Sequence, residues 1–289
     1  MHQPTRSKEK LSISEEVPQP EPGLSVQEEE KVEEKARLRA AVVYEIIRAE
    51  GEGELARAGS ALWWSGLAAG ISMGFSFLGQ ATLAAHLPDA PWRDAVASFG
   101  YSIGFLIVIL GRQQLFTENT LTPVLPVMAH PTLAWIAVLL RLWAIVFAAN
   151  MVGGFLFALT LSQSTMFEPQ VVREFGAMVE HVMANTPGQM FLKAVGAGWL
   201  VAALVWMMPS AEGSEFPLIL VMGYLIALFG FTHIVAGSAE IMYGWLVGQV
   251  SVADGILVFL LPTLAGNVVG GTLLFGVLSY RQVREEIDE

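Results

Sequence analysis

The sequence predicts an all-α membrane protein with six transmembrane helices, arranged as an inverted repeat of three plus three. Apolar residues make up 54% of the 289-residue chain, charged residues only 15%, and the mean hydropathy is +0.53. The motif Asn150–Gly154 (Asn-Met-Val-Gly-Gly) recurs as Asn267–Gly271, 117 residues later. Phe116-Thr117 likewise recurs as Phe231-Thr232, 115 residues later. A repeat of this length is typical of the two halves of a transporter, where paired interrupted helices mark the permeation path.

The chain before the first apolar stretch divides into two parts. Residues 1–35 are rich in Glu, Pro, Ser and Gln, which predicts a disordered acidic tail because so few apolar side chains can be buried. Residues 36–60 place Val43, Ile46 and Ile47 on one helical face, which predicts an amphipathic helix. Residues 61–281 are the predicted membrane domain, and residues 282–289 form a second short tail.

Apolar stretches of about 20 residues are long enough to cross a bilayer. The predicted spans are Ala61–Leu87, Trp92–Ala129, Thr132–Leu161, Gln189–Met208, Phe216–Val250 and Gly255–Tyr280. The second and fifth are too long for one simple helix, and we expect breaks at Arg112–Asn119 and Thr232–Gly237. A helical stripe of apolar side chains from Val171 to Met183 predicts an interfacial helix on the outer face.

Charge predicts the topology and excludes several classes of partner. Basic residues precede the first span and follow the last, so the positive-inside rule places both termini in the cytoplasm of a multi-pass plasma (inner) membrane protein. Three crossings per half is an odd number, so the second half inserts upside down relative to the first. The net charge of −11 argues against a nucleic-acid partner. With no cysteine, no His-rich cluster and no nucleophile–base spacing, we expect neither an enzyme nor a metal or cofactor site.

The two predicted breaks carry the chemistry. The first is too polar to face lipid, and the second contains His233, the only histidine deep within a predicted span. Asn119 and Ser238 are good N-cap types, so we expect a half-helix to restart after each break with its N-terminus directed at the centre. Such electropositive ends favour an anion. His233 would be the proton partner, and Thr117 would supply a hydroxyl donor opposite it.

Other polar residues in apolar surroundings are candidates for a supporting network. Arg112 paired with Glu118 or Glu240 would form an ion pair that braces the breaks, a reading we favour over a direct role in selectivity. Asn150 and Asn267 either mark close helix packing together with their glycines or also hold the two broken loops. The residues alone leave both readings open.

Three motifs resemble those of one family. Leu115–Asn119 (Leu-Phe-Thr-Glu-Asn) resembles the Leu-Phe-Thr-Gly/Ser-Asn loop of the formate/nitrite transporters, and Phe231–Ala236 is similar to their Phe-Glu-His-Ser-Val-Ala signature. Asn267–Gly271 matches their final-helix motif. The resemblance covers residues 61–280 and implies an aquaporin-like protomer, a homopentamer in the lipid bilayer and passage of small monovalent anions. It implies pore residues at Thr117, His233, Leu115, Phe116, Asn119, Tyr101, Phe105 and Ile226.

The chain departs from that family pattern at four places. Thr232 replaces a Glu, Gly237 replaces an Asn, Gly198 stands where many members have Asn, and Glu118 stands where a small residue is usual. An ionised Glu118 beside the pore would oppose an anion.

The predicted function is a channel or transporter for small monovalent anions such as formate or nitrite, with proton coupling through His233 as one form of it. The alternatives are a pore for a small neutral solute and a membrane scaffold or sensor that acts through the N-terminal tail.

Overall fold

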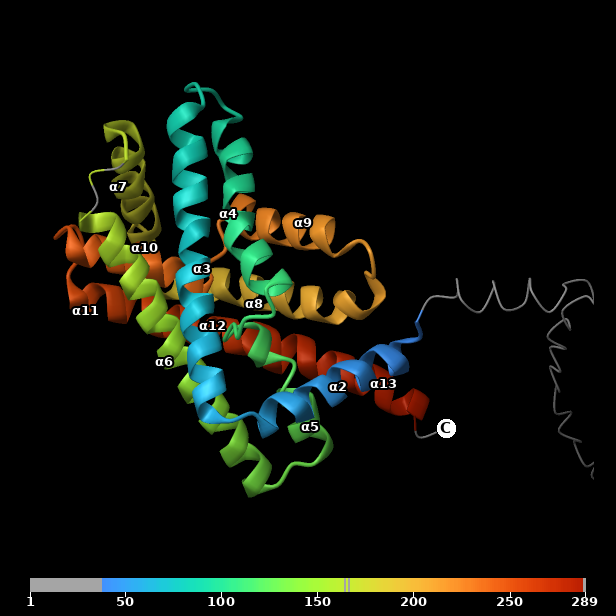
Figure 1. Cartoon of the computed structure of the whole chain (residues 1–289). Coiled ribbons are helices and arrows are strands. Elements are labelled where there is room, and N and C mark those ends of the chain that lie inside the picture. Colours follow the sequence, from blue (N-terminus) through green and yellow to red (C-terminus); the bar gives the residue numbers. More distant parts are fainter. Residues whose placement is uncertain (1–37, 164, 166, 288–289) are drawn as a thin grey trace, which may run out of the picture. The chain divides into compact units, whose positions relative to one another are not determined.

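The computed structural model describes residues 38–163, 165 and 167–287, so the predicted tail at 1–35 lies outside the described residues. Every regular element in this described part is helical (Figure 1). The longer helices are α2 (Ala40–Ala56), α3 (Gly59–His86), α4 (Arg93–Leu110), α6 (Leu133–Gln163), α7 (Pro169–Met183), α8 (Pro187–Met207), α9 (Glu215–Leu228) and α10 (Ile234–Leu246). The shorter elements are the 3₁₀ turns η1 (Glu118–Thr120) and η2 (Met208–Ser210), helices α5 (Val124–Ala129), α11 (Val252–Asp254), α12 (Leu261–Val268) and α13 (Val277–Ile287), and the π-helical segments η3 (Gly255–Leu260) and η4 (Val269–Gly276).

The predicted crossings are present as helices. In the described residues, five helices are long and apolar enough to cross a membrane: Gly59–His86, Arg93–Leu110, Leu133–Gln163, Pro187–Ser210 and Val252–Glu285. The fifth predicted span, Phe216–Val250, is divided between α9 and α10, and the second is interrupted after α4, as expected from their excess length. The all-α fold with broken second and fifth helices is therefore confirmed. The inverted relation of the two halves stays a prediction.

The two breaks begin with the same backbone motif. After α4, Gln113 N donates to Val108 O (3.0 Å) and Arg112 N to Ile109 O (3.1 Å), with Arg112 in the left-handed region at φ 51°. After α9, Phe231 N donates to Ile226 O and Gly230 N to Ala227 O (both 2.9 Å), with Gly230 at φ 61°. Both are Schellman C-caps, which end a helix by turning the chain through a left-handed residue. Arg112 and Gly230 are equivalent, and they lie 118 residues apart.

The structure corrects three expectations about the breaks. The Phe-Thr pairs, 115 residues apart, do not occupy equivalent places. The second break ends at His233 and not at Gly237, so Ser238 lies inside α10, where its Oγ donates to Ile234 O (2.5 Å). Asn119 is not an N-cap either, because it lies within η1 and α5 begins only at Val124. Residues 234–237, expected to belong to the break, form the buried first turn of α10.

Glycines of the repeated motif let helices approach until their backbones touch. A Cβ on Gly153 of α6 would collide with Leu67 O of α3, and a Cβ on Gly270 of η4 would collide with Val195 O of α8. In both halves the repeated motif therefore packs its helix directly against the first helix of that half. Small residues at such contacts are the general means of close packing in membranes.

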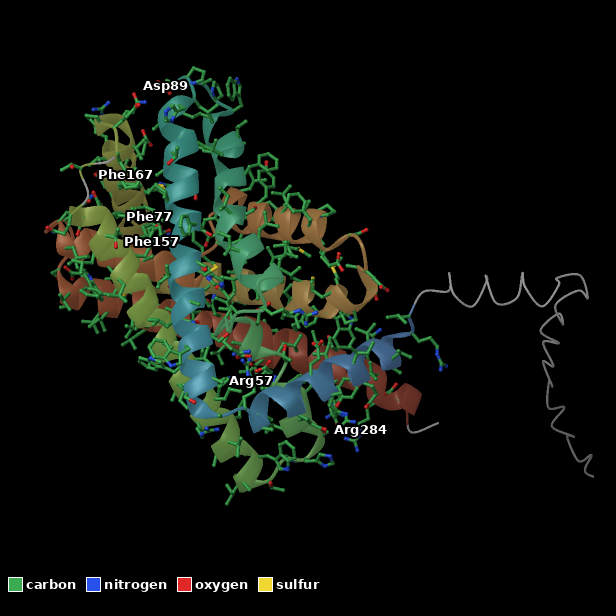
Figure 2. The ribbon with its side chains drawn as sticks, viewed as in Figure 1. Arg57, Phe77, Asp89, Phe157, Phe167 and Arg284 are labelled. Atoms are coloured by element: carbon green, nitrogen blue, oxygen red, sulfur yellow. The ribbon has the colours of Figure 1, made fainter. Side chains whose placement is uncertain are left out.

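Helices α2 and α7 lie beside this bundle. On α2, Val43, Tyr44 and Ile47 are buried against a cluster that includes Leu121 and Leu125 of the first break and of α5. Ile46, expected on the same apolar face, is instead 36% exposed. A second cluster joins α3, α6, α7 and α10 (Figure 2) and is built from Phe77, Phe157, Val171, Phe175, Val179 and Tyr243.

Candidate functional site

Two buried asparagines hold the two breaks with equivalent hydrogen bonds. Asn150 Oδ1 accepts from Phe116 N (2.9 Å), and its Nδ2 donates to Gly66 O (2.7 Å) and Gln114 O (2.9 Å). Asn267 Oδ1 accepts from Ile234 N (2.8 Å), and its Nδ2 donates to Ala194 O (2.8 Å) and Thr232 O (3.0 Å). Each amide satisfies backbone groups that a break leaves without helical partners. The open question about these residues is thereby answered, since they hold the loops as well as mark close packing.

The two breaks meet at a hydrogen bond between Thr117 and His233. The distance from Thr117 Oγ1 to His233 Nε2 is 2.7 Å, and both side chains are buried. His233 is also the N-cap of α10, where its Nδ1 accepts from Ala236 N (3.2 Å). An Nδ1 that accepts a hydrogen bond carries no proton, so neutral His233 carries its proton on Nε2 and donates it to Thr117.

This tautomer orients the hydroxyl of Thr117. Because Thr117 Oγ1 accepts from His233, its own proton remains available. In the described part of the chain, no acceptor is placed to receive that proton. The junction of the breaks therefore presents one O–H donor whose orientation is fixed by a neutral imidazole. It is a ready hydrogen-bond donor for an anion.

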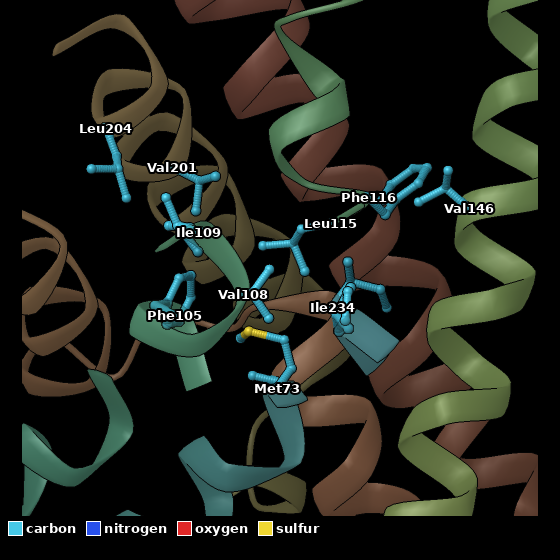
Figure 3. Packing of buried hydrophobic residues seen from close by; sticks show 14 of the residues in the cluster. Met73, Phe105, Val108, Ile109, Leu115, Phe116, Val146, Val201, Leu204 and Ile234 are labelled. Carbon is cyan, nitrogen blue, oxygen red and sulfur yellow. The ribbon is translucent and has the colours of Figure 1, made fainter. Parts of the chain in front are cut away.

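Apolar side chains surround this pair. The rings of Phe105 and His233 pack edge to face, with centroids 5.0 Å apart. The ring centroids of Tyr101 and Phe105 lie 5.7 Å apart. Leu115 points towards Phe105 and Val108 (Figure 3). Ile226 belongs to the same buried cluster. The donor thus lies among buried apolar side chains, where an electrostatic interaction is stronger than in water.

Phe116 and Asn119 make structural contacts in and beside the first break, and their predicted place in the pore stays a prediction. The ring of Phe116 packs edge to face against Trp143 and Phe147 of α6, and in Figure 3 it lies beside Val146, away from Phe105. Asn119 Nδ2 donates to Gln114 Oε1 (3.0 Å) inside the first break. Leu115 is the structural equivalent of His233 at the 118-residue offset.

The predicted bracing ion pair is absent. Among the described residues, no ion pair joins Arg112 to Glu118 or to Glu240. Arg112 is the left-handed cap of α4 and its side chain is exposed. Glu118 is half-buried beside Thr117. Glu54 of α2 approaches the same break, where its Oε2 accepts from Gln114 Nε2 (2.8 Å).

A cavity of about 440 Å³ leads to His233. It is lined by residues of α3, α4, α7, α8, α9, α10 and η3 and of the second break, among them Tyr101, His181, Lys193, Thr232, His233 and Glu240. At the cavity, Arg93 Nη2 and Glu174 Oε1 form an ion pair of 2.6 Å. Lys193, by contrast, has no ion-pair partner within the described ranges.

Sequence reasoning missed Lys193, although a signal was available. Lys193 is the sole cation of the apolar span Pro187–Met207. A charged residue inside such a span is a candidate functional residue, because a charge at membrane depth is costly. No group of three or more His, Cys, Asp or Glu side chains that could hold a metal ion occurs in the described residues.

Comparisons with known proteins decide the family. Residues 41–281 match the formate/nitrite transporter family. The chain belongs to that family. Among its relatives, inner membrane protein YfdC of Escherichia coli (strain K12) is 43% identical over 255 residues, which cover 88% of this chain and 82% of YfdC. Formate channel FocA of Haemophilus influenzae is 26% identical over 240 residues, covering 74% of this chain and 83% of FocA.

Solved structures share the fold of this formate/nitrite transporter family member. A pentameric formate channel with formate bound aligns with a TM-score of 0.65 at 20% identity, covering 78% of this chain and 97% of that one. An FNT family ion channel aligns with a TM-score of 0.67 at 21% identity, covering 84% and 96%. The aquaporin-like fold expected from the resemblance is therefore confirmed.

The structure also explains three departures from the family motifs. A Cβ on Gly198 would collide with the backbone of Asn267, so this position has no room for an Asn side chain. A Cβ on Gly237 would meet the ring of Phe259 at 2.5 Å. Thr232 Oγ1 donates to Met190 O (3.0 Å) and so ties the second break to α8, which a Glu at the same place could do only if protonated.

Proposed function

We propose that this protein passes small monovalent anions such as formate or nitrite across the plasma (inner) membrane as a homopentamer with one pore in each subunit. Family membership and the names of its relatives, a formate channel and an inner membrane protein, support this proposal. The pentameric formate channel with the same fold supports the assembly. Both termini would lie in the cytoplasm.

The observation that carries the proposal is the Thr117–His233 pair. It places an available O–H donor in a dry constriction at the inner end of a cavity that Lys193 lines. Lys193 would attract an anion into the cavity, and Thr117 would replace part of the anion's hydration at the narrowest point. The N-terminus of α10 adds its positive dipole end at His233.

Flux through the purified full-length protein in proteoliposomes tests this proposal. We expect uptake of formate and nitrite well above that of protein-free vesicles, and no comparable uptake of uncharged solutes of similar size such as urea. Uptake of urea without formate or nitrite would support a neutral-solute pore and contradict the proposal. Absence of all flux, with a partner bound to residues 1–60, would favour the scaffold instead.

Replacement of Glu118 by Gln should raise anion flux. Glu118 lies next to Thr117, and a negative charge there opposes an anion in the constriction. Removing the charge with little change in shape should raise formate flux roughly tenfold. This is the lower end of the range by which local electric fields change association rates, roughly 10–10³. Glu118→Asp, which keeps the charge, is the matched control. Equal flux in wild type and both variants would show that this carboxylate does not act on the permeating anion.

A further inference from the structure

Glu240 is a buried carboxyl group that the function proposed above does not use. It lies on α10 seven residues after His233, so both side chains share one face of the helix, about 10 Å apart along its axis. Its side chain lines the cavity that ends at His233, yet the residue is only 6% exposed. An anion moving through the cavity towards Thr117 would therefore pass this group.

Nothing in the described residues compensates a negative charge on Glu240. Its Oε1 is fully buried and has no hydrogen-bond partner, and no Lys, Arg or His lies within ion-pair distance. Ionised, such a carboxylate would bear a large desolvation penalty. The neutral acid, which has an O–H donor, is the favoured form. The titratable and charged groups that line the same cavity are Arg93, Asp94, Tyr101, Glu174, His181, Lys193 and His233.

His233 is poorly placed to exchange protons with a cargo. Its Nδ1 already accepts the N–H of Ala236, and its Nε2 proton is donated to Thr117. Adding a proton at Nδ1 would break the N-cap of α10, and a helix loses stability when its N-cap is lost. A group that can give up a proton without such a loss lies two turns away, at Glu240.

We propose that Glu240 is the proton donor of this cavity, which makes the cargo the conjugate base of a weak acid. This inference rests on the anion passage proposed above. The O–H bond of Glu240 breaks as an O–H bond forms on the anion, so the charge moves from the cargo to the Glu240 carboxylate. The neutral acid then crosses the constriction at Leu115 and Phe105. A proton from water in the cavity then restores the carboxyl group of Glu240.

Simultaneous measurement of anion uptake and internal pH in proteoliposomes tests the inference. Wild type should carry one proton with each formate. Glu240→Gln keeps the size and an N–H donor but has no transferable proton, and general acids contribute about 10²–10⁴-fold. We therefore expect formate uptake to fall about 100-fold, whereas uptake of chloride, the anion of a strong acid, stays unchanged. Glu180→Gln, an exposed change on α7, is the matched control and should behave as wild type.

The outcomes separate this inference from the proposed function. Wild-type protein that carries no anion would overturn both. Formate uptake with protons that persists in Glu240→Gln, or wild-type uptake without protons, would overturn only the role of Glu240. A second measurement needs no Gln variant: the infrared difference spectrum of wild type with and without formate. We expect formate to shift the carbonyl stretch of one protonated side-chain carboxyl group. In Glu240→Asp this band should not occur at the wild-type frequency. An unchanged carboxyl region would contradict the proposal.

Discussion

Thr117→Val is expected to reduce formate flux about 10- to 100-fold. Valine matches the shape of threonine but removes the hydroxyl that His233 orients, so the cargo meets no donor at position 117. A buried acceptor left without its partner costs about 1–3 kcal/mol, and each 1.4 kcal/mol corresponds to a factor of ten. Initial rates of formate uptake into proteoliposomes, normalised to the amount of folded protein, measure this effect.

Thr117→Ser is the matched control for that variant. Serine keeps the hydroxyl and should retain most of the flux. His233→Ala is a less clean test, because it removes the N-cap of α10 together with the partner of Thr117. A Thr117→Val protein that transports formate as fast as wild type would show that the permeating anion does not depend on this hydroxyl.

Asn267→Leu is expected to prevent stable folding. Leucine is close to asparagine in size but leaves Ile234 N, Ala194 O and Thr232 O buried without partners. Each unsatisfied buried group costs about 1–3 kcal/mol, so the three together approach the whole stability of about 5–15 kcal/mol of a typical protein. Thermal unfolding in detergent and the yield of monodisperse protein report the loss.

Asn185→Leu provides the matched control. Asn185 also donates to two carbonyl groups, His181 O (3.3 Å) and Val182 O (2.8 Å), but it lies at the half-exposed end of α7, where water can replace it. Its loss should change the unfolding temperature little. Equal stability of the Asn185 and Asn267 variants would contradict the role given to the inner amide. Asn150→Leu should resemble Asn267→Leu, because its contacts are equivalent.

The sequence by itself determined the helical membrane fold, the six crossings and the identity of the two broken ones. These follow from the length and apolarity of each stretch, which the bilayer thickness translates directly into spans. The sequence also singled out Thr117, His233, Asn150 and Asn267 as candidate residues of the breaks, because polar groups at membrane depth require partners. The repeat was visible too, but its alignment on the Phe-Thr pairs was shifted by three residues, since sequence identity does not report which backbone groups are left unpaired.

Only the tertiary structure decided how these residues act. The tautomer of His233 depends on the N–H of Ala236. Arg112 occupies the left-handed position that ends α4, a position where glycine is the usual residue. That Leu115 faces Phe105 while Phe116 packs on α6 follows from the hydrogen bonds that fix the loop. The cavity that joins Lys193, Glu240 and His233 brings together two helices, α8 and α10. Composition and periodicity describe one helix at a time, whereas the chemistry of a buried group is set by the neighbours that the fold brings to it.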